Sequence, residues 1–270
     1  MKIAAIQMVS GANLQRNLDI AGQLLAQAAA QGAELAVLPE YFCLMGERDT
    51  DKLKIQETCG SGPIQDFLSR CARDLGLWIV GGTLPISTTA AERVRNSSLV
   101  FDATGQCVTR YDKIHLFRFD NGVECYDEAR VLEAGTQAVT FDLASCDGNT
   151  YRIGLSICYD LRFPELYRQL AADVLLVPSA FTFTTGQTHW EVLLRARAIE
   201  NLAYVIAAAQ GGVHDNRRRT WGHSMMIDPW GQILAQQAGG PAVIVAEVTQ
   251  EFLQSARARL PALNHTVLGA

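Results

Sequence analysis

The sequence predicts an α/β protein in which helices cover a mixed sheet or two packed sheets. Three observations support this fold class. Short apolar runs, typical of buried strands, alternate with helical patterns, and further strands are separated by Gly and Asn as in hairpins. No linker, low-complexity tract or repeat divides the 270 residues. We therefore expect a single domain over residues 1–270.

The first half of the chain opens with a predicted β-α-β unit. Lys2–Met8 and Leu35–Leu38 are apolar and are expected to form strands. Between them, Leu14–Gln31 has apolar residues three and four positions apart, which predicts a helix. A second helix is expected over Gly62–Leu75. The strands expected after it have hairpin character and cover Trp78–Gly82, Ser97–Asp102 and Cys107–Tyr111.

The second half continues the alternation. Arg152–Ile157 is a predicted strand that leads through a turn into a helix near Pro164, because Pro suits the first turn of a helix. Thr188 and Glu191 have the spacing of a capping box, which predicts that a helix begins there and runs to Asn201. The remaining elements are strands at Val174–Val177, Ala203–Ala209, His223–Ile227 and Ala242–Val248, and a short helix near Gln250–Arg259.

Composition narrows the class of partner. The chain carries a formal charge of −5 with a pI of about 5.6, which argues against a general attraction to nucleic acid or anionic lipid. A membrane helix would need about 20 mostly apolar residues, and the apolar runs are shorter. Met1–Ser10 is too short and too mixed for a secretory signal. We expect a small-molecule partner, with neither nucleic acid nor membrane.

The cysteines and histidines are scattered along the chain. Seven cysteines without a C-x-x-C pair indicate free thiols in a reducing, cytoplasmic compartment. The five histidines show no zinc-ligand spacing, so we expect no metal site and no cofactor. His189 and His223 are expected to be structural rather than catalytic, because one falls in the capping turn and the other at a strand start.

Three ionisable residues stand where predicted strands end. Cys158 follows an apolar strand and enters a tight turn before a helix, which would expose a nucleophilic thiol. Glu40 and Lys113 follow other strands, and reactive groups gather beyond the carboxyl ends of strands in α/β sheets. Composition alone favours non-catalytic roles for these three residues, because most cysteines are buried packing residues and most Glu and Lys side chains are solvated.

These three segments together resemble the nitrilase superfamily of carbon–nitrogen hydrolases. The motifs are Leu38-Pro-Glu40-Tyr41, Tyr111-Asp-Lys113-Ile-His-Leu-Phe117 and Ser156-Ile-Cys158-Tyr-Asp-Leu-Arg-Phe-Pro-Glu165. The resemblance extends over nearly the whole chain and implies a single-domain α-β-β-α sandwich. It also implies a homodimer or higher homo-oligomer that pairs through helices flanking the sheets.

The resemblance implies a catalytic set of Glu40, Lys113 and Cys158. Related enzymes carry a second glutamate in the loop between the Lys and Cys segments. Glu128 is the best match in this sequence, although Glu124 and Glu133 are near enough to compete.

Amide hydrolysis needs a nucleophile, oxyanion stabilisation and a proton for the departing amine. Cys158 would form a thioester, Lys113 and the backbone N–H of Tyr159 would bind the oxyanion, and Glu40 would move the protons. If Glu40, Glu128 and Lys113 are ionised, the site already carries a charge of −1. We therefore expect a neutral resting thiol, because burial and like charge both raise a thiol pKa.

Within the superfamily, residues 178–200 and 219–231 look most like the deaminated glutathione amidases. Their substrate, an amide of a 2-oxoglutarate-derived acyl group with cysteinylglycine, carries two carboxylates. Arg162 is our first candidate to bind one of these carboxylates. A structural ion pair of Arg162 with Asp160 or Glu165 is an equal alternative. The arginine run at 217–219 is the second candidate. Phe181 is a candidate pocket wall, with core packing equally plausible. The alternatives are an omega-amidase acting on 2-oxoglutaramate and a catalytically silent scaffold.

Overall fold

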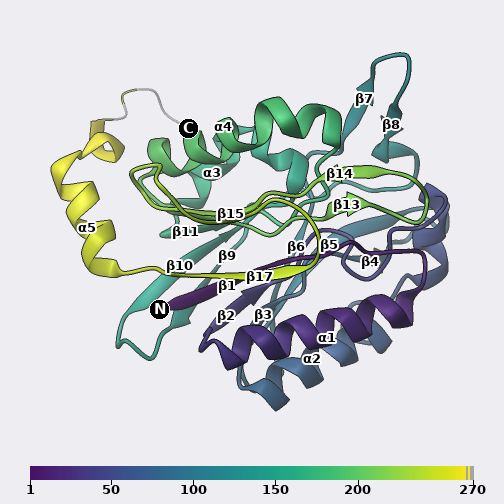
Figure 1. Ribbon diagram of the computed structural model, residues 1–270, viewed down its shortest axis with the longest axis horizontal. Helices are drawn as coiled ribbons and strands as arrows, with labels where there is room; N and C mark the ends of the chain where they lie inside the picture. The colour runs from purple at the N-terminus through teal and green to yellow at the C-terminus, as the bar shows by residue number, and fades with distance from the viewer. Residues whose placement is uncertain (266, 268–270) are drawn as a thin grey trace.

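The computed structural model describes residues 1–265 and 267 and shows two β-sheets packed face to face between layers of helices (Figure 1). The seven-stranded sheet contains β1 (Lys2–Gln7), β2 (Leu35–Val37), β3 (Trp78–Val80), β4 (Leu84–Ser87), β5 (Val94–Phe101), β6 (Cys107–Asp112) and β17 (Ala242–Glu247). Its order is β17-β1-β2-β3-β5-β4, and β6 also pairs with β5.

The six-stranded sheet has the order β16-β15-β12-β11-β10-β9. Its strands are β9 (Thr140–Ala144), β10 (Thr150–Leu155), β11 (Val174–Leu176), β12 (Tyr204–Ala207), β15 (Ser224–Ile227) and β16 (Ile233–Gln237). Two hairpins lie outside both sheets, β7 (Arg118–Asp120) with β8 (Cys125–Asp127), and β13 (Gly211–Val213) with β14 (Arg219–Trp221).

The helices form the outer layers. The chain has α1 (Leu14–Ala30), α2 (Pro63–Leu75), α3 (Pro164–Leu170), α4 (Phe183–Asn201) and α5 (Gln250–Arg259). Figure 1 shows α1 and α2 on the outer face of the seven-stranded sheet, and α3 and α4 on that of the six-stranded sheet. The predicted α-β-β-α sandwich is therefore confirmed, whereas a single domain over 1–270 stays a prediction.

Strand β1 illustrates why the sheets pack on both faces. Side chains alternate across a strand, and in β1 all of them from Ile3 onward are buried. Ile3 and Ala5 pack into the core between the sheets, whereas Ala4 and Ile6 pack into the core beneath α1 and α2. This continuous apolar run made β1 predictable, because a strand covered on both sides needs no polar face.

The start of α1 follows a local capping signal, whereas the start of α4 does not. The Asn13 side chain accepts a hydrogen bond from the Arg16 N–H at the start of α1 (2.9 Å). The prediction that α4 begins at Thr188 was wrong, because the helix begins at Phe183. The capping-box residues lie inside it, and Thr188 instead donates to the carbonyl of Thr185.

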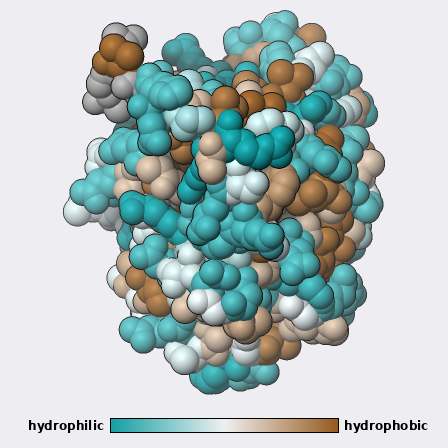
Figure 2. All heavy atoms as spheres, turned by 90° about the vertical axis from the view of Figure 1, so that its left-hand side faces the viewer, coloured by the Kyte–Doolittle hydropathy of each residue, from teal (hydrophilic) through white to brown (hydrophobic). Residues whose placement is uncertain are grey.

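Helix α5 closes one end of the sandwich. It buries Leu253 and Ala256, while Phe252 stays partly exposed. Figure 2 shows that this end of the molecule is mainly hydrophilic, with smaller hydrophobic areas between the polar residues. None of the helices in the described part of the chain combines the length and apolar composition that a membrane span requires.

Candidate active site

The site is built where strands of both sheets end. Glu40 follows β2 and Lys113 follows β6, both in the seven-stranded sheet, whereas Cys158 follows β10 of the six-stranded sheet. All three are buried, with Glu40 and Lys113 each 1% exposed and Cys158 8% exposed. Segments far apart in the sequence thus converge, as expected for strand ends in an α/β fold.

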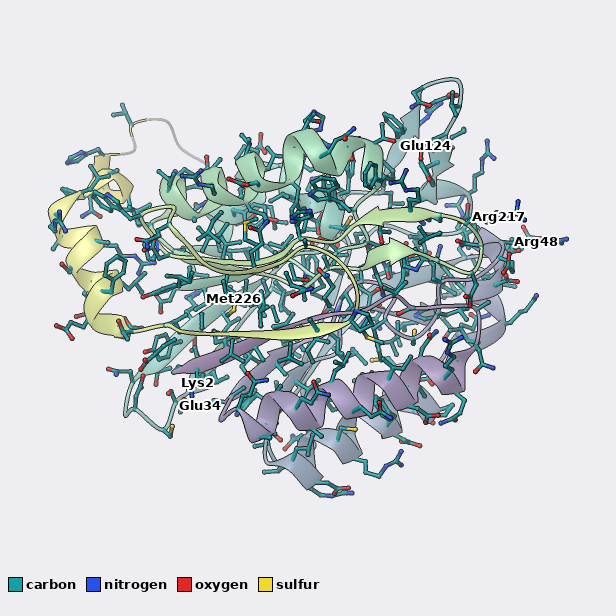
Figure 3. All side chains as sticks on the ribbon, in the orientation of Figure 1. Lys2, Glu34, Arg48, Glu124, Arg217 and Met226 are labelled. Carbon is teal, nitrogen blue, oxygen red and sulfur yellow. The ribbon has the colours of Figure 1, made fainter. Side chains whose placement is uncertain are left out.

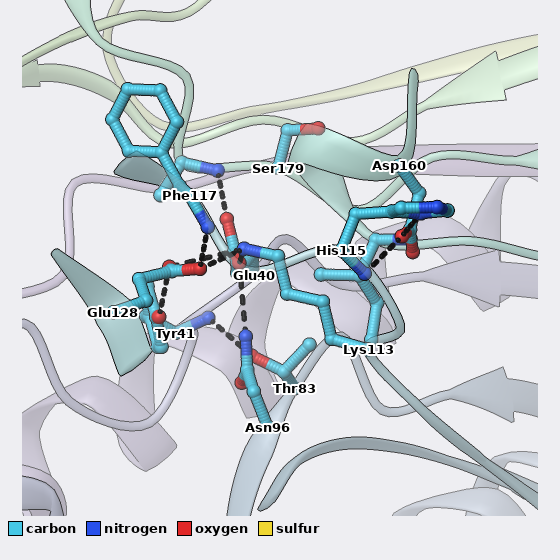
Figure 4. Close-up of polar contacts among 12 residues, drawn as sticks. Glu40, Tyr41, Thr83, Asn96, Lys113, His115, Phe117, Glu128, Asp160 and Ser179 are labelled. Atoms are coloured by element: carbon cyan, nitrogen blue, oxygen red, sulfur yellow. Dashed lines mark hydrogen bonds and ion pairs between the residues drawn. The ribbon is translucent and has the colours of Figure 1, made fainter. Parts of the chain in front are cut away.

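The ammonium group of Lys113 lies between two carboxylates (Figure 4). Its Nζ is 2.9 Å from Glu40 Oε1, and 3.0 and 2.8 Å from the two oxygens of Glu128. Burial alone would lower the pKa of Lys113, but these two carboxylates raise it above its ordinary value. Lys113 therefore stays charged and holds the two acids together.

Glu40 is fixed by three donors. Besides Lys113, the Asn96 Nδ2 donates to Oε1 (2.9 Å), and the backbone N–H of Ala180 donates to Oε2 (2.8 Å). Both carboxylate oxygens therefore have defined directions, which a group that transfers protons needs.

Glu128 is the second carboxylate. Its Oε1 accepts from the Tyr41 hydroxyl (2.9 Å) and its Oε2 from the Phe117 N–H (2.7 Å). Burial opposes ionisation, yet Lys113 lowers the pKa of Glu128 below its usual value. The competing glutamates point elsewhere, since Glu124 accepts from Thr184 and Glu133 pairs with Arg95.

Cys158 sits in a sharp turn with φ of +49°, at the first position of the short 3₁₀ helix Cys158–Arg162. Its N–H donates to the carbonyl of Pro178 (2.9 Å), which holds this left-handed conformation. The next N–H, of Tyr159, lies in the first helical turn, where backbone donors lack partners within the helix. It is therefore available to a bound oxygen.

The turn is tied to β6 by one buried carboxylate. Asp160 is fully buried, and its Oδ2 accepts from the Ile157 N–H (2.8 Å) and the Tyr111 hydroxyl (2.6 Å). Its Oδ1 contacts the N–H (3.0 Å) and Nδ1 (2.8 Å) of His115 (Figure 4). Asp160 thus couples the segment that carries Cys158 to the segment that carries Lys113.

The electrostatics of the site favour a neutral thiol. Burial raises the pKa of Cys158 well above its ordinary value. The Glu40 carboxylate raises it further, Lys113 opposes this, and Glu128 adds to the rise. Glu40 and Cys158 line the same pocket, so a carboxylate that can accept a proton faces the space into which the thiol opens.

Cys158 opens into a narrow pocket. Glu40, Glu128, Tyr159 and Phe181 line it, and Phe181 also packs in the core between the sheets. Further lining residues are Phe117, Ala180, Thr182, Thr185 and Arg218.

Arg162, the first candidate for carboxylate recognition, does not line this pocket in the structure. Its guanidinium lies 5.5 Å from the Phe181 ring and 5.8 Å from the Tyr159 ring, and its Nη2 is 3.2 Å from His189 Nδ1. Among the residues the structure describes it forms no ion pair with Asp160 or Glu165.

Sequence reasoning missed two contributors to the site and ranked a third only second. Tyr41 and Asn96 orient the two carboxylates, but one follows a strand and the other lies inside a strand, with nothing local to mark them. Arg218 belongs to the run at 217–219, which was the second candidate for carboxylate recognition because such a run usually indicates a solvated loop, and it lines the Cys158 pocket. Only the fold brings these residues together.

Comparison with known proteins identifies the family. Residues 2–258 match the family model described as carbon-nitrogen hydrolase. The chain is 44% identical to the deaminated glutathione amidase of Synechocystis, over 98% of this chain and 97% of that protein.

Two solved structures share the fold. The structure of the Caenorhabditis elegans NitFhit protein matches 98% of this chain, with a TM-score of 0.87 and 34% identity. The match covers 65% of the NitFhit chain, which is less than two thirds of that protein. Saccharomyces cerevisiae Nit3, a member of branch 10 of the nitrilase superfamily, matches 97% of this chain and 94% of its own with a TM-score of 0.84 and 29% identity. The chain therefore belongs to the carbon–nitrogen hydrolase family, within the nitrilase superfamily.

Proposed function

We propose that this carbon–nitrogen hydrolase is a cysteine amidase that cleaves deaminated glutathione into 2-oxoglutarate and cysteinylglycine. The observation that carries the chemistry is the Lys113 ammonium held between Glu40 and Glu128 beside the Cys158 thiol. The 44% identity to a deaminated glutathione amidase over nearly the full length supports the substrate.

The first step joins the acyl group to the enzyme. The sulfur of Cys158 attacks the amide carbonyl carbon while its proton moves to the carboxylate of Glu40, so no free thiolate has to persist in the pocket. The C–N bond then breaks, the departing nitrogen takes the proton from Glu40, and a thioester on Cys158 remains.

The oxyanion formed by this attack needs hydrogen-bond donors. The Tyr159 N–H and an N–H of the Lys113 ammonium supply them. Lys113 has two contacts to the single carboxylate of Glu128, so exchanging one of them for the oxyanion leaves both acids paired. Glu128 would thus keep Lys113 charged and directed while the transition state forms.

The second step releases the acid. A water molecule enters where the amine has left, Glu40 accepts its proton, and the resulting hydroxide attacks the thioester. The C–S bond breaks and the thiol of Cys158 regains a proton from Glu40. Glu40 therefore returns to its starting state, which matches a carboxylate that fixed donors hold in place.

For the acyl half of the substrate we propose Phe181 as a pocket wall and Arg162 as the partner of the distal carboxylate. Arg162 lies over the rings of Phe181 and Tyr159, both of which line the Cys158 pocket. A guanidinium suits this role because it binds a carboxylate with two parallel hydrogen bonds.

Three further properties belong to the same proposal. We propose that the protein acts as a homodimer or higher homo-oligomer, and that it works in the cytoplasm. The free thiols of all seven cysteines support a reducing compartment.

Parallel kinetics of two amides test the proposed function. Deaminated glutathione should release cysteinylglycine with a higher kcat/KM than 2-oxoglutaramate releases ammonia, and Cys158→Ala should abolish both activities. A preference for 2-oxoglutaramate would identify an omega-amidase instead. Failure of the wild-type protein to cleave either amide would favour a silent scaffold.

A further inference from the structure

A second, larger cavity adjoins the Cys158 pocket. Its volume is about 440 Å³, and Arg218 lines both spaces. Tyr41 also lines the large cavity, and its hydroxyl donates to Glu128 of the catalytic cluster. Arg48, Arg217 and Glu124 also line the large cavity. Figure 3 shows Arg48 and Arg217 at the same end of the molecule, with Glu124 above them. The mechanism described above uses none of this space.

The wall of the cavity carries an excess of positive charge. Five basic and three acidic side chains line it. Lys52 is one of the basic residues in this wall, with a side chain only 15% exposed and its Nζ 4.6 Å from the centre of the Tyr41 ring. Its one ion pair among the described residues is with Asp49, which is 3.9 Å away and 66% exposed, so solvent screens this long contact.

Arg218 forms no ion pair with any of the described residues. Its guanidinium lies 4.9 Å from the Tyr126 ring, and its Nη1 is 4.0 Å from the sulfur of Met45. Its Nε is buried without a hydrogen-bond partner, and no carboxylate of the described residues forms an ion pair with it. Burying a donor of a charged group without an acceptor is costly, so such a group indicates a binding site for an anion.

The two-step chemistry decides which half of the substrate this cavity would hold. The amine leaves first, while the acyl group is still attached to Cys158, so the amine half must lie on the open side of the pocket. The cavity of 440 Å³ is the roomy neighbour of the narrow Cys158 pocket, and the exposed Arg48 and Arg217 stand along it. Ammonia as a leaving group would need no such space.

We propose that this cavity is the leaving-group subsite, in which Lys52 and Arg218 bind a carboxylate carried by the amine half of the substrate. The inference rests on the proposed function and extends it to the class of amine released, a peptide-like amine with a free carboxylate. A substrate that releases ammonia shares the acyl half but has nothing to place between these two cations.

The test compares Lys52→Met and Arg218→Gln with the wild type on deaminated glutathione and on 2-oxoglutaramate. Each variant should lower kcat/KM for deaminated glutathione about 10- to 100-fold more than for 2-oxoglutaramate, the usual effect of one charge-assisted hydrogen bond. Arg16→Gln removes a cation on the exposed face of α1 and is the matched control. Equal losses on both amides would overturn the subsite, because the cations would then act on the shared acyl half or on catalysis.

A binding measurement separates this inference from the proposed function. Calorimetry with the Cys158→Ala protein reports the affinity for deaminated glutathione without turnover. Adding Arg218→Gln should weaken binding of deaminated glutathione about tenfold or more, and should leave the affinity for its C-terminally amidated analogue unaltered. Equal weakening for both ligands, or no measurable binding of the acid form, would overturn the subsite even if the enzyme hydrolyses other amides.

Discussion

At the scale of single residues, the site is a buried cluster of charge in which one ammonium offsets two carboxylates. Lys113 contacts both Glu40 and Glu128 within 3.0 Å. A thiolate on Cys158 would add a second net negative charge in a space that excludes water. The cluster therefore favours a thiol that loses its proton only during attack, unlike a cysteine–histidine ion pair.

Alkylation of Cys158 at different pH values tests this picture. Iodoacetamide reacts with the thiolate, so labelling of the peptide that contains Cys158 should reach its midpoint well above neutral pH. Glu40→Gln removes a carboxylate that raises the pKa of Cys158, and should move the midpoint to lower pH. A wild-type midpoint clearly below about 7 would contradict a neutral resting thiol.

The sequence was sufficient to single out the three residues to which we assign the chemistry, because each stands in a short motif after a strand. It was insufficient for the residues that orient them. The sequence favoured Glu128 only as the best match, and the contact with Lys113 distinguishes it from Glu124. The buried Nε of Arg218 could not be recognised within a run of three arginines. Such assignments depend on packing between distant segments.

At the scale of elements, apolar and periodic segments were predicted closely, whereas several short strands were missed. The apolar β1 and β2 and the periodic α1 were predicted within two residues at each end. Strand β16 was missed, because its sequence ILAQQ is only half-buried and partly polar. The start of α4 was misplaced because tertiary packing of its first turns outweighs the capping box. Within them Gly186 lies so close to Trp221 that a Cβ atom there would sit 2.3 Å from its side chain.

The loop that carries Glu40 depends on a glycine in the next strand connection. Gly82 has φ of +51°, and a Cβ atom there would lie 2.1 Å from the carbonyl oxygen of Pro39. Gly82→Ala should lower the free energy of unfolding by about 2–4 kcal/mol, from backbone strain and forced displacement together. It should also reduce kcat, because the Pro39 segment moves with Glu40.

Urea unfolding and steady-state kinetics measure these two effects. Gly122→Ala is the control, since Gly122 also has positive φ (+81°) but no atom within 4 Å of the added Cβ. We expect it to cost only the conformational strain of about 1–2 kcal/mol and to retain the wild-type kcat. If Gly82→Ala were as mild as this control, the proposed coupling between the strand connection and Glu40 would be wrong.

At the scale of the whole molecule, two sheets share their inner core, and the site lies where the ends of both meet. This arrangement buries thiols as well as carboxylates. Burial raises the pKa of Cys43 to about 12, and burial also raises the pKa of Cys158. A thiol that stays neutral in the native protein but ionises when unfolded makes folding less favourable as pH rises.

The sign gives a measurable pH dependence of stability. Above about pH 8.5 an unfolded cysteine loses its proton while native Cys43 keeps its own, so the free energy of unfolding falls by about 1.4 kcal/mol per pH unit for this group. Between pH 8 and 10, the free energy of unfolding of Cys43→Ala should therefore fall by about 2 kcal/mol less than that of the wild type.

The exposed Cys125 provides the control, because Cys125→Ala should keep the wild-type slope of unfolding free energy against pH. The measurement is urea unfolding of the three proteins at several pH values. The slopes of unfolding free energy against pH are compared, so the constant loss of stability from truncating Cys43 does not affect the result. Parallel slopes for Cys43→Ala and wild type would show that this buried thiol is not linked to stability.

The central claim is that Cys158 carries the acyl group between two half-reactions. Rapid acid quenching during turnover of deaminated glutathione, followed by mass spectrometry of peptides, tests it most directly. The account predicts an adduct on the peptide that contains Cys158, with the mass of 2-oxoglutarate less one water, and its absence in Cys158→Ala. Turnover without such an adduct, or an adduct on another residue, would contradict it.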